Sequence, residues 1–541
     1  MDSVTRSRVT AAFLRGSPAE ALGAHMGRMG GFATAAGTAG FAAAHPLGHQ
    51  RAHLRLGGTG LTVSGVGFGC YRVSYRSPSH HQALVQALLG GVNLIDTSTN
   101  YTNGESERLV GEVLTEQIGG GTLRREEVVV VTKAGYLQGE NYQIALMREF
   151  HSNPYPEVVK IQDQLWHCIS PEFLADQLDR SLKRLQLRSV DVLLLHNPEY
   201  FLKAAHMHGA ADERVSTEYY RRLGAAFLHL EEEVNEGRIA WYGISSNTFV
   251  ESTQEPEFTS LQRVLETVGS VIGKEHHLQV VQLPANLVEP GAALEHNQRG
   301  GTMSALELAA EADLGVLINR PLNGYDARRL HRLADIPATK EAPPPAGVDA
   351  QLQAIGRFEE SFLAQLRTEL GAEHEAIAPL ESFLVIGSQL GSAWRRLGSY
   401  ENWCEVREGA LEPRLRGIGH VMAAADGGAG GPLRVQAQDY VAQVRVLLGL
   451  LDAHYAASGR AERQAWHDHL EPVLPPSLQG LSLSQKAIVL LRSLPADPCV
   501  LVGMRQPAYV RDVIGAMAYE PPAAGAELWR RIGGAPPMPR E

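Results

Sequence analysis

The chain is poor in the residues and motifs that mark several common protein classes. Only four of its 541 residues are cysteine, and no two of them form a CxxC pair, which argues against a disulfide framework and a zinc ribbon. Basic residues are outnumbered by acidic ones, 49 against 60, and this balance argues against nucleic-acid binding. No GxGxxG turn follows the first predicted strand, as most doubly wound dinucleotide-binding folds would require. A hydrophobic content of 44% is nevertheless enough to build globular cores.

Long apolar runs are also scarce. The stretch 30–50 is uncharged and long enough to span a bilayer, but it consists mostly of alanine and glycine and contains Pro46, which excludes a transmembrane helix. The first 56 residues have no lysine, six arginines and two acidic residues, a charge of +4, so the remainder carries −15. We therefore predict a disordered organellar transit peptide over 1–53, mitochondrial in preference to plastid. A disordered leader on a cytoplasmic protein is the alternative.

Beyond the leader, short apolar runs alternate with amphipathic helical patterns. Continuous β-branched and leucine runs are typical of parallel strands that are buried on both faces. Eight such strands with helices between them predict an α/β fold of the (β/α)8 TIM-barrel type, with a doubly wound sheet as the alternative. The predicted strands cover residues 64–70, 91–95, 128–133, 190–196, 240–245, 278–283, 315–319 and 499–503.

The alternation is interrupted by Pro-rich and Gly-rich segments and by long helical patterns. We predict that residues 54–324 and 481–520 form the barrel and that residues 325–480 form a mostly helical insertion before the last helix and strand. The tail, 521–541, is rich in proline, glycine and alanine and is expected to be poorly ordered.

Polar residues end three of the predicted strands, where barrel enzymes carry their active residues. Asp96 follows GVNLI, Lys133 follows VVVVT, His196 follows DVLLL, and Tyr101 lies five residues after Asp96. A nearby ammonium group favours a tyrosine phenolate, so the lysine is expected to lower the tyrosine pKa and ease proton transfer to a carbonyl oxygen. Singly, each residue could be a cap, a core residue or a rim residue. Together they predict a proton-delivery set without a nucleophile or a metal.

These motifs resemble the aldo-keto reductase superfamily. GVNLIDTSTNYTNGESERLVGEVL is similar to the family's first signature, VVVVTKAG to its lysine strand and VDVLLLHNPE to its histidine strand. By this resemblance the catalytic residues are Asp96, Tyr101, Lys133 and His196, acting with a nicotinamide dinucleotide. Thr102 departs from the signature, which usually has glycine after the tyrosine.

The resemblance also implies residues at the nicotinamide end of the cofactor. YGISSNTF is similar to the segment whose Ser and Asn hold the carboxamide, so Ser245 and either Ser246 or Asn247 are expected there. Gln282 matches the glutamine of the same contact. Ordinary hydrogen bonding at the barrel rim is the alternative for all of them.

Two further segments depart from the family, one that would stack an aromatic residue on the nicotinamide and one at the adenosine end. Asn319 and Arg320 replace an aromatic-Ser segment, and Arg320 is expected to meet the pyrophosphate or an acidic substrate. LVGMRQPAYVRDVIGAM resembles the adenosine-binding end. Gly503 begins its loop, Asp512 stands where the family commonly has Glu, and Arg505 is suited to a 2′-phosphate. The resemblance therefore favours NADP, with NAD as the alternative.

The substrate wall is expected in the long loop 136–169, with Trp166 and His167 as candidates. The His-x-His pairs at 206–208 and 467–469 follow no predicted strand, so we assign no metal site. The sequence thus predicts a reductase that interconverts an aldehyde, ketone or sugar carbonyl with its alcohol, without a nucleic-acid or membrane partner. The alternatives are a cofactor-sensing subunit whose helical insertion docks a partner protein, and a metal-dependent barrel hydrolase.

Overall fold

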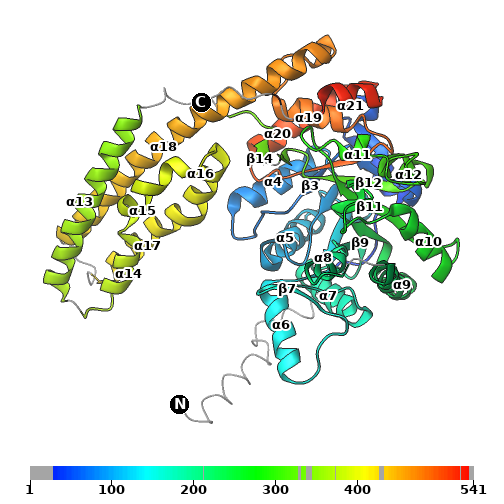
Figure 1. Ribbon diagram of the computed structural model, residues 1–541, viewed down its shortest axis with the longest axis horizontal. Helices are drawn as coiled ribbons and strands as arrows, with labels where there is room; N and C mark the ends of the chain where they lie inside the picture. The colour runs from blue at the N-terminus through cyan, green and yellow to red at the C-terminus, as the bar shows by residue number, and fades with distance from the viewer. Residues whose placement is uncertain are drawn as a thin grey trace. The chain divides into compact units, whose positions relative to one another are not determined.

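The structure is a computed structural model that describes residues 28–210, 213–326, 330–336, 344–371, 373–425, 432–523, 525–534 and 536. The chain divides into two compact units, each described here by itself. The barrel unit comprises Met1–His331 and Pro475–Gly534, and the helical unit comprises Arg332–Leu474 and Ala535–Glu541. Figure 1 shows their elements.

Eight parallel strands close into a barrel in the order β10-β11-β12-β15-β3-β4-β5-β9. Each coincides with a strand predicted from the sequence, so the predicted (β/α)8 barrel is confirmed. The strands are β3 (Val66–Gly69), β4 (Leu94–Asp96), β5 (Val129–Ala134), β9 (Val190–His196), β10 (Ile239–Ser245), β11 (Leu278–Pro284), β12 (Gly315–Asn319) and β15 (Cys499–Val502).

The barrel interior is filled by alternate residues of its strands. Val129 and Val131 of β5, and Val192 and Leu194 of β9, belong to one buried cluster with residues of the facing strands. Successive side chains of a strand point to opposite faces, so the residues between them are buried against the outer helices. Both faces of the sheet are thus covered, which is why the strands read as unbroken apolar runs.

Helices cover the outside of the barrel. In α7, Pro171 occupies the first turn, and Phe173, Leu174 and Leu178 lie on a buried face at helical spacing. The other covering helices are built in the same way. They are α4 (Pro78–Leu89), α5 (Glu105–Gly119), α7 (Pro171–Arg184), α9 (Glu213–Asn235), α10 (Leu261–Val271), α12 (Ala305–Glu311), α19 (Leu483–Leu491) and α20 (Pro507–Gly515).

The segment after β5, predicted as a long loop, is instead structured. It contains α6 (Gly139–Phe150) and an antiparallel sheet in the order β6 (Tyr136–Leu137), β8 (Leu165–His167) and β7 (Val159–Gln162). Shorter elements complete the barrel side of the chain: α8 (Tyr200–Met207), α11 (Gly291–Leu294), β13 (Asn323–Tyr325) and β14 (Leu330–Arg332).

The N-terminal segment corrects one prediction. Residues 28–53 were expected to belong to a disordered leader, but they pack on the barrel; residues 1–27 lie outside the described residues. Helix α3 (Ala35–Ala44) buries Phe41 at 2% exposure, and β1 (His53–Arg55) pairs with β2 (Thr62–Ser64).

The backbone N–H of Ala33 donates to Asp191 Oδ1 at 2.6 Å. Asp191 is fully buried in β9 and also pairs with Arg125 at 2.8 Å. A buried carboxylate needs such partners, and one of them comes from the segment predicted to be a leader.

The described part of the tail corrects a second prediction. Residues 521–541 were expected to be poorly ordered, but helix α21 (Ala526–Ile532) forms within them. It packs near α11 and buries Trp529 and Ile532. Two large apolar side chains at i and i+3 give this short helix a face to bury, which the surrounding proline and glycine obscure in the sequence.

The helical unit has its own hydrophobic core. Trp394, Trp403 and Tyr440 are buried in this core, and buried Glu359 accepts a hydrogen bond from Tyr440 Oη at 2.6 Å. Its helices are α13 (Pro345–Leu370), α14 (Ile377–Phe383), α15 (Ile386–Ala393), α16 (Tyr400–Val406), α17 (Glu412–Ala425) and α18 (Pro432–Leu470).

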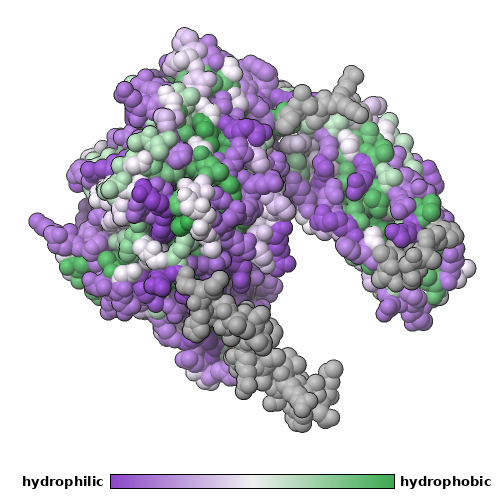
Figure 2. All heavy atoms as spheres, turned by 180° about the vertical axis from the view of Figure 1, so that it is seen from behind, coloured by the Kyte–Doolittle hydropathy of each residue, from purple (hydrophilic) through white to green (hydrophobic). Residues whose placement is uncertain are grey.

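No helix within the described ranges of either unit has the length and apolar character needed to cross a membrane. Hydrophilic residues are spread over the visible face of each unit (Figure 2).

Candidate active site

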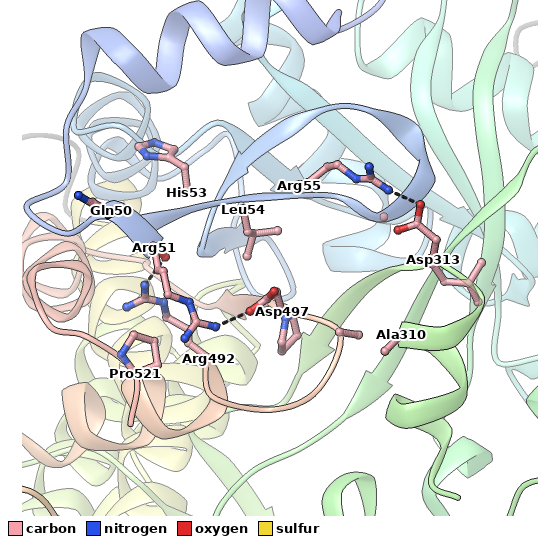
Figure 3. A pocket seen from close by; sticks show the side chains of 14 residues that line it. Gln50, Arg51, His53, Leu54, Arg55, Ala310, Asp313, Arg492, Asp497 and Pro521 are labelled. Carbon is pink, nitrogen blue, oxygen red and sulfur yellow. Dashed lines mark hydrogen bonds and ion pairs between the residues drawn. The ribbon is translucent and has the colours of Figure 1, made fainter. Parts of the chain in front are cut away.

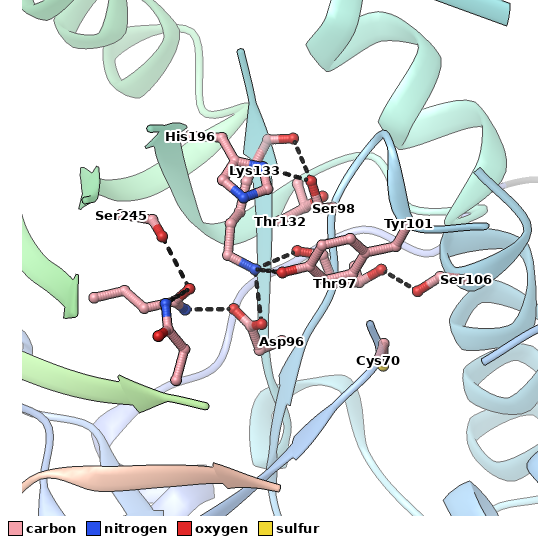
Figure 4. Close-up of polar contacts among 12 residues, drawn as sticks. Cys70, Asp96, Thr97, Ser98, Tyr101, Ser106, Thr132, Lys133, His196 and Ser245 are labelled. Carbon is pink, nitrogen blue, oxygen red and sulfur yellow. Dashed lines mark hydrogen bonds and ion pairs between the residues drawn. The ribbon is translucent and has the colours of Figure 1, made fainter. Parts of the chain in front are cut away.

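The four predicted catalytic residues meet at the carboxyl end of the barrel (Figure 4). Lys133 on β5 is fully buried, and its Nζ donates to Asp96 Oδ2 at 2.7 Å and to Tyr101 Oη at 3.1 Å. The Tyr101 and His196 rings lie edge to face with centroids 5.9 Å apart. The closed barrel brings these residues together because β4, β5 and β9 are neighbouring parallel strands that end at one rim.

Burial sets the electrostatics of this cluster. It raises the pKa of Asp96, against the opposing effects of Lys133 and Gln282. For Lys133, burial alone lowers the pKa, but the neighbouring Asp96 and Tyr101 outweigh it and the pKa is raised. The lysine therefore stays charged while it contacts both oxygens.

The pKa of Tyr101 corrects an expectation. We expected Lys133 to lower it, and the ammonium does favour the phenolate. Burial of the hydroxyl has the larger effect, however, and raises the pKa of Tyr101 to about 12. Without a ligand, the tyrosine is thus held as the neutral phenol, which is the form of a proton donor.

His196 is held neutral and oriented. Burial, followed by the charge of Lys133, lowers its pKa well below the ordinary value. Its Nδ1 lies 3.0 Å from the hydroxyl of Ser98, a residue that sequence reasoning missed. Ser98 follows β4 by two positions in the DTSTN loop, so its spacing after the strand end was the available signal.

The loop that carries Tyr101 has an unusual backbone. Thr102 and Asn103 both have left-handed conformations, with φ of 48° and 55°. Asparagine tolerates this region, whereas a β-branched threonine does so at a cost. Thr102 occupies the position at which the family signature has glycine, the residue that adopts this conformation most easily.

At the predicted nicotinamide end, three residues form a chain of hydrogen bonds that leads to Asp96. Ser245 Oγ donates to Gln282 Oε1 at 3.0 Å, and Gln282 Nε2 donates to Asp96 Oδ1 at 2.8 Å. Asn319 Nδ2 lies 3.4 Å from Gln282 Oε1, and the buried Asn319 Oδ1 has no hydrogen-bond partner. The pairing of β10 with β11 and of β11 with β12 places these residues side by side.

The structure separates the two alternatives for the residue after Ser245. The Ser246 hydroxyl is fully buried and contacts Thr248 Oγ1 at 3.2 Å. The Asn247 side chain is exposed, and its backbone N–H donates to Glu199 Oε1 at 2.9 Å. Asn247 is therefore the better placed of the two to meet a ligand.

Two of the residues predicted at the pyrophosphate and adenosine end have partners within the chain. Arg320 is partly exposed and forms an ion pair with Glu289 at 3.5 Å. Asp512 is already engaged, because its two oxygens accept hydrogen bonds from the hydroxyls of Ser482 and Ser484.

The remaining two predicted residues of this end lie in the loop between β15 and α20. Gly503 is exposed, and a Cβ added there would meet nothing within 4 Å. Arg505 lies two residues further on and is partly buried.

The two predicted substrate residues point in different directions, as neighbours on β8 must. Trp166 packs edge to face on Tyr142 at 4.9 Å, whereas the His167 Nε2 lies 2.7 Å from the carbonyl oxygen of His196. Tyr136, which sequence reasoning also missed, contacts the His196 ring at 4.7 Å. Its position three residues after Lys133 was the only signal in the sequence.

Several known proteins resemble this chain in sequence. The family whose model matches the chain is the Aldo/keto reductase family, over residues 66–266. The chain is 29% identical over 199 residues to an NADH-specific methylglyoxal reductase of Escherichia coli, and the alignment covers 34% of this chain and 55% of the relative. It is 28% identical over 181 residues to a 6-dehydroglucose reductase of Novosphingobium aromaticivorans, and this alignment covers 32% of this chain and 50% of the relative. The chain thus spans about half the length of the curated relatives it matches.

Alignments with solved structures were found as well. A glycerol dehydrogenase from Gluconobacter oxydans aligns with a TM-score of 0.43 and 14% identity, over 90% of this chain and 94% of that one. An aldo-keto reductase from Klebsiella pneumoniae in complex with NADPH aligns with a TM-score of 0.30 and 22% identity, over 50% and 68%. The family match and the closed barrel together show that this chain carries an aldo-keto reductase domain.

Proposed function

We propose that the barrel unit interconverts a carbonyl compound and its alcohol with a nicotinamide dinucleotide, Tyr101 being the proton donor or acceptor. One observation carries the proposal. The buried Lys133 ammonium contacts the Asp96 carboxylate and the Tyr101 hydroxyl at the same time. This arrangement can stabilise a tyrosine that has lost its proton, and it contains no nucleophile.

The residues at the rim fit a nicotinamide carboxamide. The buried Asn319 Oδ1 is an acceptor without a partner, which a carboxamide N–H would satisfy. Ser245 and Gln282 lie next to it and are fixed by hydrogen bonds to one another. When bound, the dinucleotide would supply the hydride for the carbonyl carbon.

The chain's own residues then handle the proton. Tyr101, neutral up to high pH, donates its proton to the carbonyl oxygen, and Lys133 stabilises the resulting phenolate. Asp96 keeps the ammonium charged and in place. Ser98 engages Nδ1 of His196, which leaves the Nε2 atom to orient the carbonyl oxygen. In alcohol oxidation each of these transfers runs in reverse.

The first test is Tyr101→Phe. We expect NADPH binding to be unchanged, because the phenyl ring keeps its contacts, and turnover of carbonyl substrates to fall by about a hundredfold or more. Binding is read by quenching of intrinsic fluorescence and turnover by NADPH absorbance over a panel of aldehydes, ketones and sugars. Tyr325→Phe, at an exposed tyrosine, is the matched control. Unchanged turnover in Tyr101→Phe would remove the tyrosine from the mechanism.

For the cofactor we propose NADP in preference to NAD, with Arg505 at the 2′-phosphate. The support is chemical, since a guanidinium pairs well with phosphate. The names of the relatives include enzymes for both cofactors. Arg505→Ala should weaken NADPH binding about tenfold or more and leave NADH binding within about twofold. Arg511→Ala, an exposed arginine in α20, is the control. Equal losses for both cofactors would assign Arg505 elsewhere.

The substrate side of the site is proposed to be aromatic. Tyr136 and His167 line the approach to His196, while Trp166 packs against Tyr142. For residues 1–27 we retain the proposal of a transit peptide to the mitochondrial matrix. The alternative is a cofactor-sensing subunit whose helical unit docks a partner protein. A chain that binds NADPH but reduces no compound of the panel would favour it.

A further inference from the structure

A pocket of about 420 Å³ lies at the end of the barrel opposite the catalytic cluster (Figure 3). Its lining includes Asp313 and Asp497, which lie two residues before β12 and β15 begin, so it opens at the amino ends of the strands. The N-terminal segment around Arg51 and the segment at Pro521 complete its wall. The pocket is therefore formed by parts of the chain that lie outside the predicted barrel boundaries as well as by the barrel itself.

The lining is rich in arginine. Arg51, Arg55 and Arg492 all line the pocket, against the two carboxylates of Asp313 and Asp497. Burial lowers the pKa of His53, which also lines the pocket. With that histidine neutral, the lining carries a net charge of +1.

Arg492 distinguishes this pocket from an ordinary surface hollow. It is 3% exposed, and its guanidinium donates to the backbone carbonyls of Ala516, Tyr519 and Arg51. No carboxylate of the described residues lies within ion-pair distance of it. Arginine is almost never buried without an anionic partner. Burial, followed by the charge of Arg51, lowers the pKa of Arg492 to about 10.

A second polar side chain, His53, also lines the pocket. Figure 3 shows Arg51 and Arg492 at one end of the pocket and Arg55 with Asp313 at the other.

Arg51 and Arg55 each have an aspartate partner, but either arginine can exchange that partner for an anion in the pocket. Arg51 pairs with Asp497 at 2.6 Å, but the side chains are 50% and 64% exposed, and the Arg55–Asp313 pair is similarly exposed. Exposed pairs contribute only about 0–1 kcal/mol. An anion held by the buried Arg492 could therefore share the guanidinium of Arg51 at little cost.

We propose that this pocket binds a small organic anion, a metabolite carrying a phosphate or carboxylate group, at a site separate from the catalytic cluster. The anion would pair with Arg492 and Arg51. By bridging the N-terminal segment, the end of α19 and the segment at Pro521, it would hold these parts of the chain together.

The test uses the full chain and two probes, pyrophosphate and citrate, followed by isothermal titration calorimetry. We expect at least one probe to bind with a stoichiometry of one at this pocket and to protect residues 50–57 and 496–498 from hydrogen exchange. The exchange readout also separates this site from the cofactor site, at which pyrophosphate could bind. Binding of neither probe, or protection confined to the catalytic end, would overturn the proposal.

Variants sharpen this test. Arg492→Gln should weaken binding most, but it can also impair folding, because Arg492 holds three carbonyl groups. Arg51→Ala, at an exposed side chain, should weaken binding about tenfold, as expected for loss of a charged hydrogen bond. Arg299→Ala removes an equal charge from an exposed pair with Glu311 elsewhere and should have no effect.

A substitution that should strengthen anion binding discriminates best between a binding role and a structural role of the arginines. Asp497→Asn frees Arg51 and removes a repelling charge, so it should tighten anion binding about threefold or more. A purely structural role for the arginines predicts no such gain. Unchanged or weaker binding in Asp497→Asn would therefore count against the proposal, whatever Arg492→Gln does. Because none of these residues belongs to the proposed catalytic machinery, the outcome is independent of the proposed reductase activity.

Discussion

The buried ion pair between Lys133 and Asp96 makes a prediction about stability as well as chemistry. Asp96→Asn preserves the shape of the side chain and one oxygen for Gln282, but it removes the charge that compensates Lys133. The lysine is fully buried, and the two charged atoms are 2.7 Å apart. Burial then dominates, so the pKa of Lys133 should fall.

The expected magnitude follows from the exposure of the pair. Removing one partner of a buried ion pair costs about 3–5 kcal/mol, whereas replacing both by apolar or neutral groups is often close to neutral. The double variant Asp96→Asn with Lys133→Met also loses the lysine's bonds to Tyr101 and to the Thr97 carbonyl, at about 1 kcal/mol each. We therefore expect the double variant to lie about 2 kcal/mol below the native protein, and thus above the single variant.

Native-state hydrogen exchange read by mass spectrometry is the suitable assay. The chain has two units, so one denaturation curve would not report on the barrel alone. Amides of β4 and β5 give the opening free energy of the barrel itself. If Asp96→Asn and the double variant lose the same stability, the two charges are not coupled and the reasoning about the cluster fails.

Two further predictions concern pH and the N-terminal segment. Burial lowers the pKa of His167 to about 4. Because the unfolded chain takes up this proton near pH 6.5, the contribution of His167 to the barrel's stability is complete above that pH and falls by about 3 kcal/mol as the pH drops to 4. His167→Gln should reduce the pH dependence of hydrogen-exchange stability by about that amount and leave the part due to His196, and an unchanged slope would assign the dependence to other groups. Gly37→Ala would place a Cβ 2.4 Å from the Glu126 carbonyl oxygen and should expose residues 28–52 to limited proteolysis. At Gly40 an added Cβ meets nothing within 4 Å, so Gly40→Ala should not change the cleavage. Equal cleavage of both variants would refute the packing of the N-terminal segment on the barrel.

The fold and the centre of the site were predictable because they depend on local patterns. Buried parallel strands have recognisable apolar runs, and the polar residue after each run must lie at one rim of a closed barrel. Asp96, Lys133 and His196 follow this rule. Tyr101 required its fixed spacing from Asp96 and the family signature as well.

Other features depend on partners that are distant in sequence. Asp191 sits inside an apolar run and gives no sign that its carboxylate receives both Arg125 and the backbone of Ala33. For the same reason residues 28–53 resembled a leader. The pKa of Tyr101 was misjudged because the sequence shows which charge lies nearby but not how completely the hydroxyl is buried.

The place of the helical unit in the chain has a consequence for the order of synthesis and folding. The barrel closes through β15, whose Cys499 pairs with Leu317 of β12 and whose Val500 pairs with Val66 of β3. Seven strands therefore leave the ribosome with two open edges, and the closing strand follows about 180 residues later, a delay of roughly 10–35 seconds at ordinary rates of translation. The helical unit emerges during that interval, and its local helix–helix contacts allow it to fold before the barrel can close.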